Sequence, residues 1–379
     1  MKIVIAIDSL KGSLTSLEAG QAIAQGIHRV DPSVHLTIKP LADGGEGTVE
    51  ALTYQKSYNL ETITATGPLG SPILCQYHRN PDTNTAILEM ATAAGLPLVP
   101  QKKRNPLYTT TYGVGEMIRD AIKKGCRNFI VGIGGSATND GGIGMLQALG
   151  FRFLTETGEN VPHGALGLSL LKAISFETVI PELKTCRFRI ACDVTNPLCG
   201  EKGCSEIYGP QKGASPSMIH DMDLWLNQYA QLAKQYHLNS DPSLPGSGAA
   251  GGLGFAFRTF TNATLESGIN IILDEINLAS DIASADLVIT GEGRLDGQTV
   301  MGKAPIGVAK LAKQWKKPVI ALAGCVEKDA WVCNQHGIDA FFPILHTIVT
   351  KEEAMDPERT KENLSNTAQQ VFRLCNIKL

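Results

Sequence analysis

Three stretches near the start of the chain predict a β–α–β unit. The continuous apolar run Ile3–Ile7 is typical of a buried strand. Thr15 and Glu18 have the spacing of a capping box. Behind them apolar side chains recur at spacings of four and three as far as Val30, which predicts an amphipathic helix. A second strand is expected at His35–Pro40.

The last third of the chain returns to the same alternation. Apolar runs at Leu287–Thr290, Val319–Ala323 and Ala340–Ile344 predict three further strands. Amphipathic stretches predict a helix between the first two of these strands and a closing helix after the third. Together with the N-terminal pair this gives five parallel strands. The expected fold class is therefore α/β, with a doubly wound parallel sheet.

The segment between these two ends follows a different pattern. Apolar or alternating runs at 62–66, 73–78 and 86–90 are separated by turn signals, which predicts an antiparallel meander. Further strands at 129–133 and 188–191 alternate with helical stretches, so this part is expected to be mixed α/β. We expect residues 61–264 to form a domain inserted into a discontinuous domain of residues 1–60 and 265–379.

Composition and charge narrow the classes of function. The chain has 379 residues, 43 % of them hydrophobic and 19 % charged, which is ordinary for a globular protein of two domains. The formal net charge is −3 and there is no basic block, so nucleic acid is not an expected partner. No apolar run approaches the length of a membrane span, and Asp8 ends the N-terminal apolar run too early for a signal peptide. Nine scattered cysteines suit a reducing cytoplasm, which is the expected location.

Glycine-rich segments that carry acidic or polar side chains recur along the chain. They are Asp8–Ser13, Asp43–Gly47, Gly132–Gly142, Asp193–Asn196, Gly246–Gly252 and Gly291–Gln298. Glycine allows a backbone to approach a ligand closely, and such loops suit a site for phosphate and a divalent cation. Several follow predicted strands, and ligands of doubly wound sheets bind beyond the carboxyl ends of the strands. A shared binding site is therefore expected there.

Two of these segments resemble nucleotide-binding motifs. Gly297–Ala304 nearly matches a phosphate-binding loop, but Ala304 replaces the hydroxyl residue that would ligate magnesium. Lys303 at a helix N-terminus could still reach a phosphate. Gly132, Gly134 and Ala137 match a dinucleotide fingerprint, with Glu156 at the distance of a ribose-binding acid. The Gly132 loop is better interpreted as a phosphate or substrate loop.

Taken together, the glycine-rich segments resemble the type-1 family of bacterial glycerate kinases. The matching stretches are DSLKGSL (8–14), PLADGGEGT (40–48), GIGGSATNDGG (132–142), ACDVTNPL (191–198), GPQKG (209–213), GSGAAGGL (246–253) and ITGEGRLDG (289–297). The resemblance runs nearly end to end, and no stretch departs from the family pattern.

This resemblance implies ATP-dependent phosphorylation of D-glycerate, at the 2-hydroxyl in this branch, with the active site in a cleft between two domains. It implies a flavodoxin-like domain interrupted by an inserted domain that resembles a restriction-endonuclease fold. ATP and Mg²⁺ are the implied cofactors, and the implied partners are D-glycerate and ATP. Assembly into a homo-oligomer stays open. Phosphorylation at the 3-hydroxyl stays open as an alternative. So do an NAD(P)-dependent oxidoreductase and a non-catalytic sensor of a small ligand.

Loop position and side-chain chemistry assign hypothetical roles within such a kinase. Lys11 and Lys303 would neutralise phosphate oxygens, and Arg294 would hold the glycerate carboxylate. Asp193 is the first choice for base or metal ligand, with Asp43 and Asp296 as alternates. Other predicted substrate or nucleotide contacts are Asp8, Ser9, Ser13, Gly134, Gly135, Ser136, Asn139, Asp140 and Asn196. The predicted metal ligands are Asp43, Glu46, Glu292 and Asp296.

Overall fold

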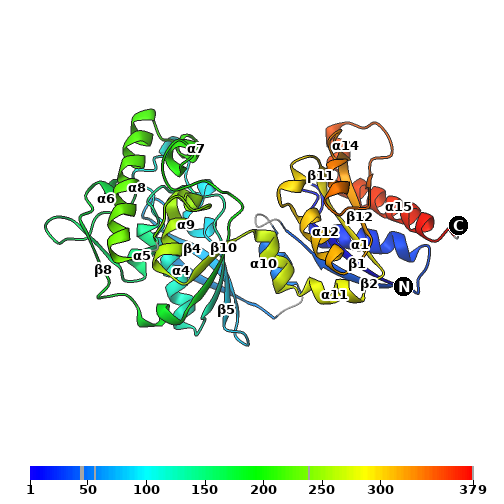
Figure 1. Ribbon diagram of the computed structural model, residues 1–379, viewed down its shortest axis with the longest axis horizontal. Coiled ribbons are helices and arrows are strands. Elements are labelled where there is room, and N and C mark those ends of the chain that lie inside the picture. Colours follow the sequence, from blue (N-terminus) through cyan, green and yellow to red (C-terminus); the bar gives the residue numbers. More distant parts are fainter. Residues whose placement is uncertain (43–46, 55–56, 238–239, 378–379) are drawn as a thin grey trace. The chain divides into compact units, whose positions relative to one another are not determined.

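The computed structural model describes residues 1–42, 47–54, 57–237 and 240–377 (Figure 1). Contacts divide the chain into two compact units. Unit 1 joins the two ends of the chain, residues 1–56 and 267–379, and unit 2 spans residues 57–266. No helix among the described residues is both long enough and apolar enough to cross a bilayer.

Unit 1 is built on a five-stranded parallel sheet. Its strands are β1 (Lys2–Ile7), β2 (His35–Pro40), β11 (Leu287–Leu295), β12 (Val319–Val326) and β13 (Ala340–Pro343). They lie in the order β13-β12-β11-β1-β2, so segments far apart in the sequence are neighbours (Figure 1). Numbered along the chain this order is 2-1-3-4-5, which is the order of flavodoxin-like sheets. All five strands predicted from the sequence are present.

Helices cover both faces of this sheet. On one face Ile3, Ile5 and Ile7 pack in a core shared with α1 (Ser16–His28) and α15 (Pro357–Cys375). Successive side chains of a strand point to opposite faces, so the buried Val4 and Ala6 face the other side. Three further helices of this unit are α10 (Gly268–Glu275), α11 (Leu278–Ser284) and α12 (Ala304–Gln314). These three helices contact one another, and α12 also contacts β1, β11 and β12. The sheet is therefore doubly wound.

One expected loop of unit 1 proves to be strand. The segment from Gly291 to Leu295 was expected to leave the sheet, but it continues β11, with Arg294 paired to Cys325 of β12. A Cβ on Gly291 would overlap the carbonyl oxygen of Leu322. Glycine is therefore required for the close approach of β12, and it marks a strand here and not a turn.

Unit 2 contains a six-stranded mixed sheet with the order β10-β9-β6-β5-β4-β3. Its strands are β3 (Asn59–Thr66), β4 (Pro72–Asn80), β5 (Thr85–Glu89), β6 (Asn128–Gly132), β9 (Arg187–Ala191) and β10 (Ala263–Glu266). Strands β3, β4 and β5 pair antiparallel, as the predicted meander requires, and β5, β6, β9 and β10 pair in parallel. A separate two-stranded ribbon joins β7 (Arg152–Leu154) to β8 (Ala173–Ser175).

The helices of unit 2 enclose an aromatic core. The longer ones are α4 (Tyr112–Lys123), α8 (Pro216–Tyr236) and α9 (Ala249–Phe260). Phe153, Tyr229 and Phe260 contact one another there, and the Tyr229 and Phe260 rings stack 6.1 Å apart. Short helices complete both units: α2 (Thr48–Thr53), α3 (Ala91–Ala94), α5 (Ile143–Ala148), α6 (Ala165–Ser169), α7 (Cys204–Tyr208), α13 (Val332–Gln335) and α14 (Lys351–Met355).

Candidate active site

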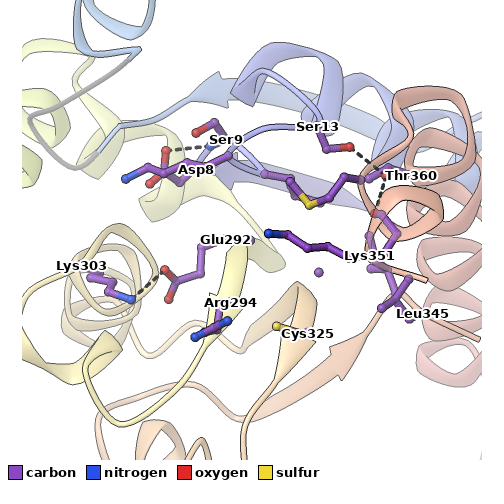
Figure 2. Close-up of a pocket in the computed structure, with 17 residues that line it drawn as sticks. Asp8, Ser9, Ser13, Glu292, Arg294, Lys303, Cys325, Leu345, Lys351 and Thr360 are labelled. Carbon is purple, nitrogen blue, oxygen red and sulfur yellow. Dashed lines mark hydrogen bonds and ion pairs between the residues drawn. The ribbon is translucent and has the colours of Figure 1, made fainter. Parts of the chain in front are cut away.

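A cavity of about 420 Å³ lies in unit 1 at the carboxyl ends of β1, β11 and β12. Parallel strands end at the same edge of a sheet, which is where a doubly wound sheet binds its ligands. Seven of the residues predicted from the sequence line this cavity: Asp8, Ser9, Lys11, Ser13, Glu292, Arg294 and Lys303 (Figure 2). The fold thus brings these seven candidates of unit 1 to one cavity, and Asp296 lies beside one of them, Lys303.

The loop after β1 forms the first wall of the cavity. The backbone N–H of Asp8 donates to the carbonyl oxygen of Gly291 (3.0 Å), and its carboxylate accepts from the N–H of Ser9 (2.7 Å). Asp8 is only 4 % exposed, whereas Lys11 is exposed. The Ser9 hydroxyl oxygen is buried and has no hydrogen-bond partner among the described residues. A buried polar atom without a partner is costly, so this hydroxyl suits a ligand.

The same loop is fastened to the C-terminal helix. The Ser13 hydroxyl donates to Thr360 Oγ1 (2.8 Å), and the Thr360 hydroxyl can donate in turn to the carbonyl oxygen of Asp356 (2.7 Å) (Figure 2). Thr360 is 3 % exposed. Ser13 therefore holds the loop in place, and its hydroxyl is already engaged with Thr360.

Glu292 and Asp296 share the ammonium group of Lys303. The Lys303 Nζ lies 3.4 Å from Glu292 Oε2 and 3.6 Å from Asp296 Oδ1. The other Glu292 oxygen accepts from the Thr299 hydroxyl (2.6 Å). Burial raises the pKa of Glu292 above its usual range, although Thr299 and Lys303 oppose this effect. Two carboxylates here converge on one cation.

Arg294 extends from β11 with its side chain 64 % exposed, 3.9 Å from the carboxylate of Glu327. Its pKa is raised, first by interaction with Cys325 and then by the charge of Glu327. This ion pair is long and solvated, so it contributes little to stability. The guanidinium is consequently available for a ligand carboxylate.

Several residues that line the cavity were not predicted from the sequence, among them Lys351, Met355 and Leu345. Figure 2 shows the Lys351 side chain extending into the cavity toward Glu292. A signal for these residues exists in the sequence. Thr350 and Glu353 form a capping box, so a helix begins shortly after β13 at the same sheet edge.

The remaining described candidates belong to unit 2, at the carboxyl ends of β6 and β9. Gly132 pairs with Ala191, so the loops that follow them start side by side. Asp193 is exposed in the second loop. The Asn196 side chain is engaged within its own loop, where its Nδ2 donates to the Lys202 carbonyl oxygen (2.9 Å) and its Oδ1 accepts from the Tyr208 hydroxyl (2.7 Å).

The Gly132 loop contains exposed glycines and fully buried polar residues. Gly134 and Gly135 are exposed, while Asn139 and Asp140 are completely buried. Asp140 accepts hydrogen bonds from the Thr111 N–H and hydroxyl (both 2.9 Å) and from the Gly142 N–H (3.0 Å). Burial raises its pKa in spite of these bonds. In this structure Asp140 holds the loop together.

A buried lysine that the sequence pattern did not single out supports the same loop. Lys212 is 2 % exposed, and its Nζ donates to the Thr138 carbonyl oxygen (2.6 Å). Burial lowers the pKa of Lys212 to about 8. The GPQKG stretch contained this residue, but a lysine in a short polar segment gave no sign that it would be buried.

The dinucleotide fingerprint does not form the structure that it requires. After β6 the chain pairs with residues 90–96, where the Leu96 N–H donates to the Gly135 carbonyl oxygen (2.8 Å), and α5 begins only at Ile143. No helix starts at the fingerprint glycines, and Glu156 lies in an exposed turn. The oxidoreductase alternative therefore loses its structural basis.

Two of the predicted metal ligands, Asp43 and Glu46, lie outside the described residues. Within the described part of the chain, no group of three or more His, Cys, Asp or Glu side chains is arranged to hold a metal ion. The Glu292–Asp296 pair is thus the metal-binding candidate that the described residues offer.

Comparison with known proteins shows the family of the chain. The sequence model of the Glycerate kinase family matches residues 3–376. The chain belongs to this family. Family membership identifies it as an enzyme, a kinase.

Individual members of the family are similar over nearly the whole chain. A glycerate kinase of Haemophilus influenzae is 46 % identical over 378 residues, covering 100 % of both chains. The glycerate 2-kinase of Escherichia coli K12 is 48 % identical, covering 93 % of each. A solved structure from Salmonella typhimurium LT2, provisionally assigned as glycerate kinase 2, superposes with a TM-score of 0.90 at 46 % identity, covering 99 % of this chain and 98 % of that one.

Proposed function

We propose that the chain transfers the γ-phosphoryl group of ATP to the 2-hydroxyl of D-glycerate, giving 2-phospho-D-glycerate and ADP. The observation that carries this proposal is the convergence of Lys11, Arg294 and Lys303 on one cavity at the carboxyl edge of the unit 1 sheet. Phosphoryl transfer depends on positioning and on neutralising charge at the phosphate oxygens, and these cations supply both.

Each step of the transfer has a proposed residue. The 2-hydroxyl oxygen attacks the γ-phosphorus while the bond from that phosphorus to the bridging oxygen breaks and ADP departs. Asp193 accepts the proton of the attacking hydroxyl. Lys11 and Lys303 neutralise phosphate oxygens, and Arg294 holds the glycerate carboxylate through two parallel hydrogen bonds.

The unit 2 loops have a supporting role in this proposal. The exposed backbone of Gly134 and Gly135 is suited to offering N–H groups to an anion. Ser136 follows them in the same loop. The hydrogen bonds of Asp140 with Thr111 and of Asn196 with Lys202 favour loop-shaping roles for these two residues. Asn139 donates to Ser205, and its buried Oδ1 has no hydrogen-bond partner among the described residues, so this oxygen stays a proposed ligand contact.

Mg²⁺ fits the carboxylate pair of unit 1. Glu292 and Asp296 already converge on one cation, and Mg²⁺ in kinases is held by one or two carboxylates together with substrate phosphates. We therefore keep both as proposed ligands, beside Asp43 and Glu46. When bound, the ion would neutralise charge on the phosphate oxygens.

The position of phosphorylation is proposed from the relatives. The Escherichia coli K12 protein, 48 % identical to this chain, is a glycerate 2-kinase. Incubation of the purified chain with ATP, Mg²⁺ and D-glycerate, followed by ³¹P NMR, tests the proposal. The phosphorus of a 2-phosphate couples to one methine proton and gives a doublet, whereas a 3-phosphate couples to a methylene and gives a triplet.

Two controls make this test specific. L-Glycerate should react much more slowly if the site distinguishes the two configurations at the second carbon. Reaction mixtures without glycerate measure ATP hydrolysis alone. A triplet would show that the 3-hydroxyl is phosphorylated in place of the 2-hydroxyl. ADP formation that does not depend on glycerate would contradict the proposed activity.

A further inference from the structure

The unit 1 cavity has a charged part and an apolar part. Its charged part contains four cationic side chains and two carboxylates among the lining residues, contributed by the loop after β1, by β11, by Lys303 and by α14. The apolar part comes from the segment after β13 and from α14, through Ile344, Leu345, Ala354 and Met355. A ligand that fills the cavity must therefore be anionic at one end and apolar at the other.

Lys351 joins the two parts. It is the first residue of α14, and Figure 2 shows its side chain reaching toward Glu292. Among the described residues no carboxylate lies within 4.0 Å of its ammonium nitrogen, in contrast to Lys303, which has two. The next turn of the same short helix carries Met355. One helix thus presents a cation and an apolar side chain to the same cavity.

Glycerate alone does not match this cavity. It is a small polyhydroxy acid with no apolar surface, and a cavity of about 420 Å³ has the size of sites for much larger ligands. A nucleoside triphosphate has an aromatic base and a polyanionic chain, which correspond to the two parts. We infer that this cavity holds the whole ATP molecule, with the base against Leu345 and Met355 and the phosphates near Lys11, Lys303 and Lys351. The inference rests on the proposed function and adds α14 to the site.

A cysteine in the cavity permits a test on the unaltered protein. Cys325 lines the cavity and is partly exposed, whereas the exposed Cys375 lies near the end of α15, outside the cavity. The protein is treated with iodoacetamide alone, with ATP or with D-glycerate, and alkylation is quantified at each cysteine by peptide mass spectrometry. ATP should slow alkylation of Cys325 at least several-fold and leave Cys375 unchanged. D-Glycerate, which the proposed function places at the neighbouring Arg294, should protect Cys325 less than ATP does.

Variants separate the two parts of the proposed site. Titration calorimetry of Lys351→Met should show affinity for ATP and for inorganic tripolyphosphate lowered roughly 10- to 100-fold, because a charge-assisted contact is lost from both. Met355→Ala and Leu345→Ala should weaken ATP binding about tenfold or less and leave tripolyphosphate binding unchanged. The matched controls are Lys310→Met and Met301→Ala, which alter exposed residues of unit 1 outside the cavity. These variants should bind ATP and tripolyphosphate with unchanged affinity.

The outcomes distinguish this inference from the proposed function. If the wild-type enzyme phosphorylates glycerate but ATP does not protect Cys325 and Lys351→Met binds ATP normally, the nucleotide lies elsewhere and only the inference fails. Protection of Cys325 by D-glycerate and not by ATP would assign the cavity to the acceptor and overturn the inference. Protection by ATP without any glycerate-dependent ADP formation would retain the nucleotide site and remove the proposed reaction.

Discussion

Gly12 lies against Met355, so that a Cβ on Gly12 would stand 2.7 Å from the terminal methyl carbon of Met355. Gly12 also has a φ of +83°, a conformation that side chains rarely adopt. The loop after β1 and helix α14 therefore meet at a point where a Cβ on the loop would require the Met355 methyl group to move. This contact couples the cationic loop to the apolar part of the cavity.

Gly12→Ala should impair both stability and nucleotide binding. The backbone conformation costs about 1–2 kcal/mol for a residue with a Cβ, and displacement of Met355 should raise the KM for ATP. Urea unfolding and steady-state kinetics measure the two effects. Gly70→Ala is the matched control, because Gly70 has a φ of +82° and a Cβ added there would meet no atom within 4 Å. The Gly70→Ala variant should lose a similar amount of stability, and its KM for ATP should stay unchanged. Equal KM values for ATP in the two variants would contradict the coupling of the loop to Met355.

Asp193→Asn should lower kcat by roughly 10²- to 10⁴-fold, the usual contribution of a general base. The amide cannot accept the hydroxyl proton, but it preserves the shape of the side chain, so the KM for both substrates should change little. Initial rates over a range of glycerate and ATP concentrations give both constants. Asp221→Asn, an exposed acid on α8, is the control. Wild-type turnover in Asp193→Asn would show that this carboxylate is not the base.

Arg294→Lys should mainly raise the KM for glycerate. Lysine keeps the charge but cannot make the two parallel hydrogen bonds of a guanidinium, so a loss of roughly 10- to 100-fold in affinity is expected. The KM for ATP should change much less, which separates this residue from Lys351. An unchanged KM for glycerate would assign the guanidinium to another contact, such as the Glu327 carboxylate 3.9 Å away.

Strands enclosed by helices were readily predicted, because burial on both faces produces continuous apolar runs. The expected strand Ile3–Ile7 lies within β1, whose residues from Ile3 to Ile7 are all buried. By contrast, β10 (Ala263–Glu266) has only four residues and no buried ones, so its sequence carries no such run. The extension of β11 through Gly291 was missed for another reason. Glycine usually weakens a strand, and only the proximity of the Leu322 carbonyl oxygen explains its presence.

The candidate site was predictable to the extent that it depends on strand ends. Asp8 and Arg294 follow from the rule that ligands bind at the carboxyl edge, even though Arg294 still belongs to β11. Lys351 and Met355 do not, because their position depends on how α15 packs against α1 and how the short helix before it is held over the loop. The capping box at Thr350 and Glu353 predicts the start of a helix, but the packing that places this helix over the loop leaves no local pattern in the sequence.

The buried Lys212 should give the stability of the protein a distinct dependence on pH. Its pKa falls from 10.5 to about 8 on folding, so between these values the unfolded chain holds a proton that the folded chain has released. Stability must then rise with pH over this range, by at most about 1.4 kcal/mol per pH unit from this group.

Lys212→Met removes the titrating group. The free energy of unfolding, measured in urea at pH 7.5 and 9.5, should therefore increase more with pH in the wild type than in Lys212→Met. Lys234→Met, an exposed lysine on α8, should behave as the wild type. Equal pH dependence in all three proteins would mean that Lys212 keeps its proton when buried, held as an ammonium by the Thr138 carbonyl oxygen.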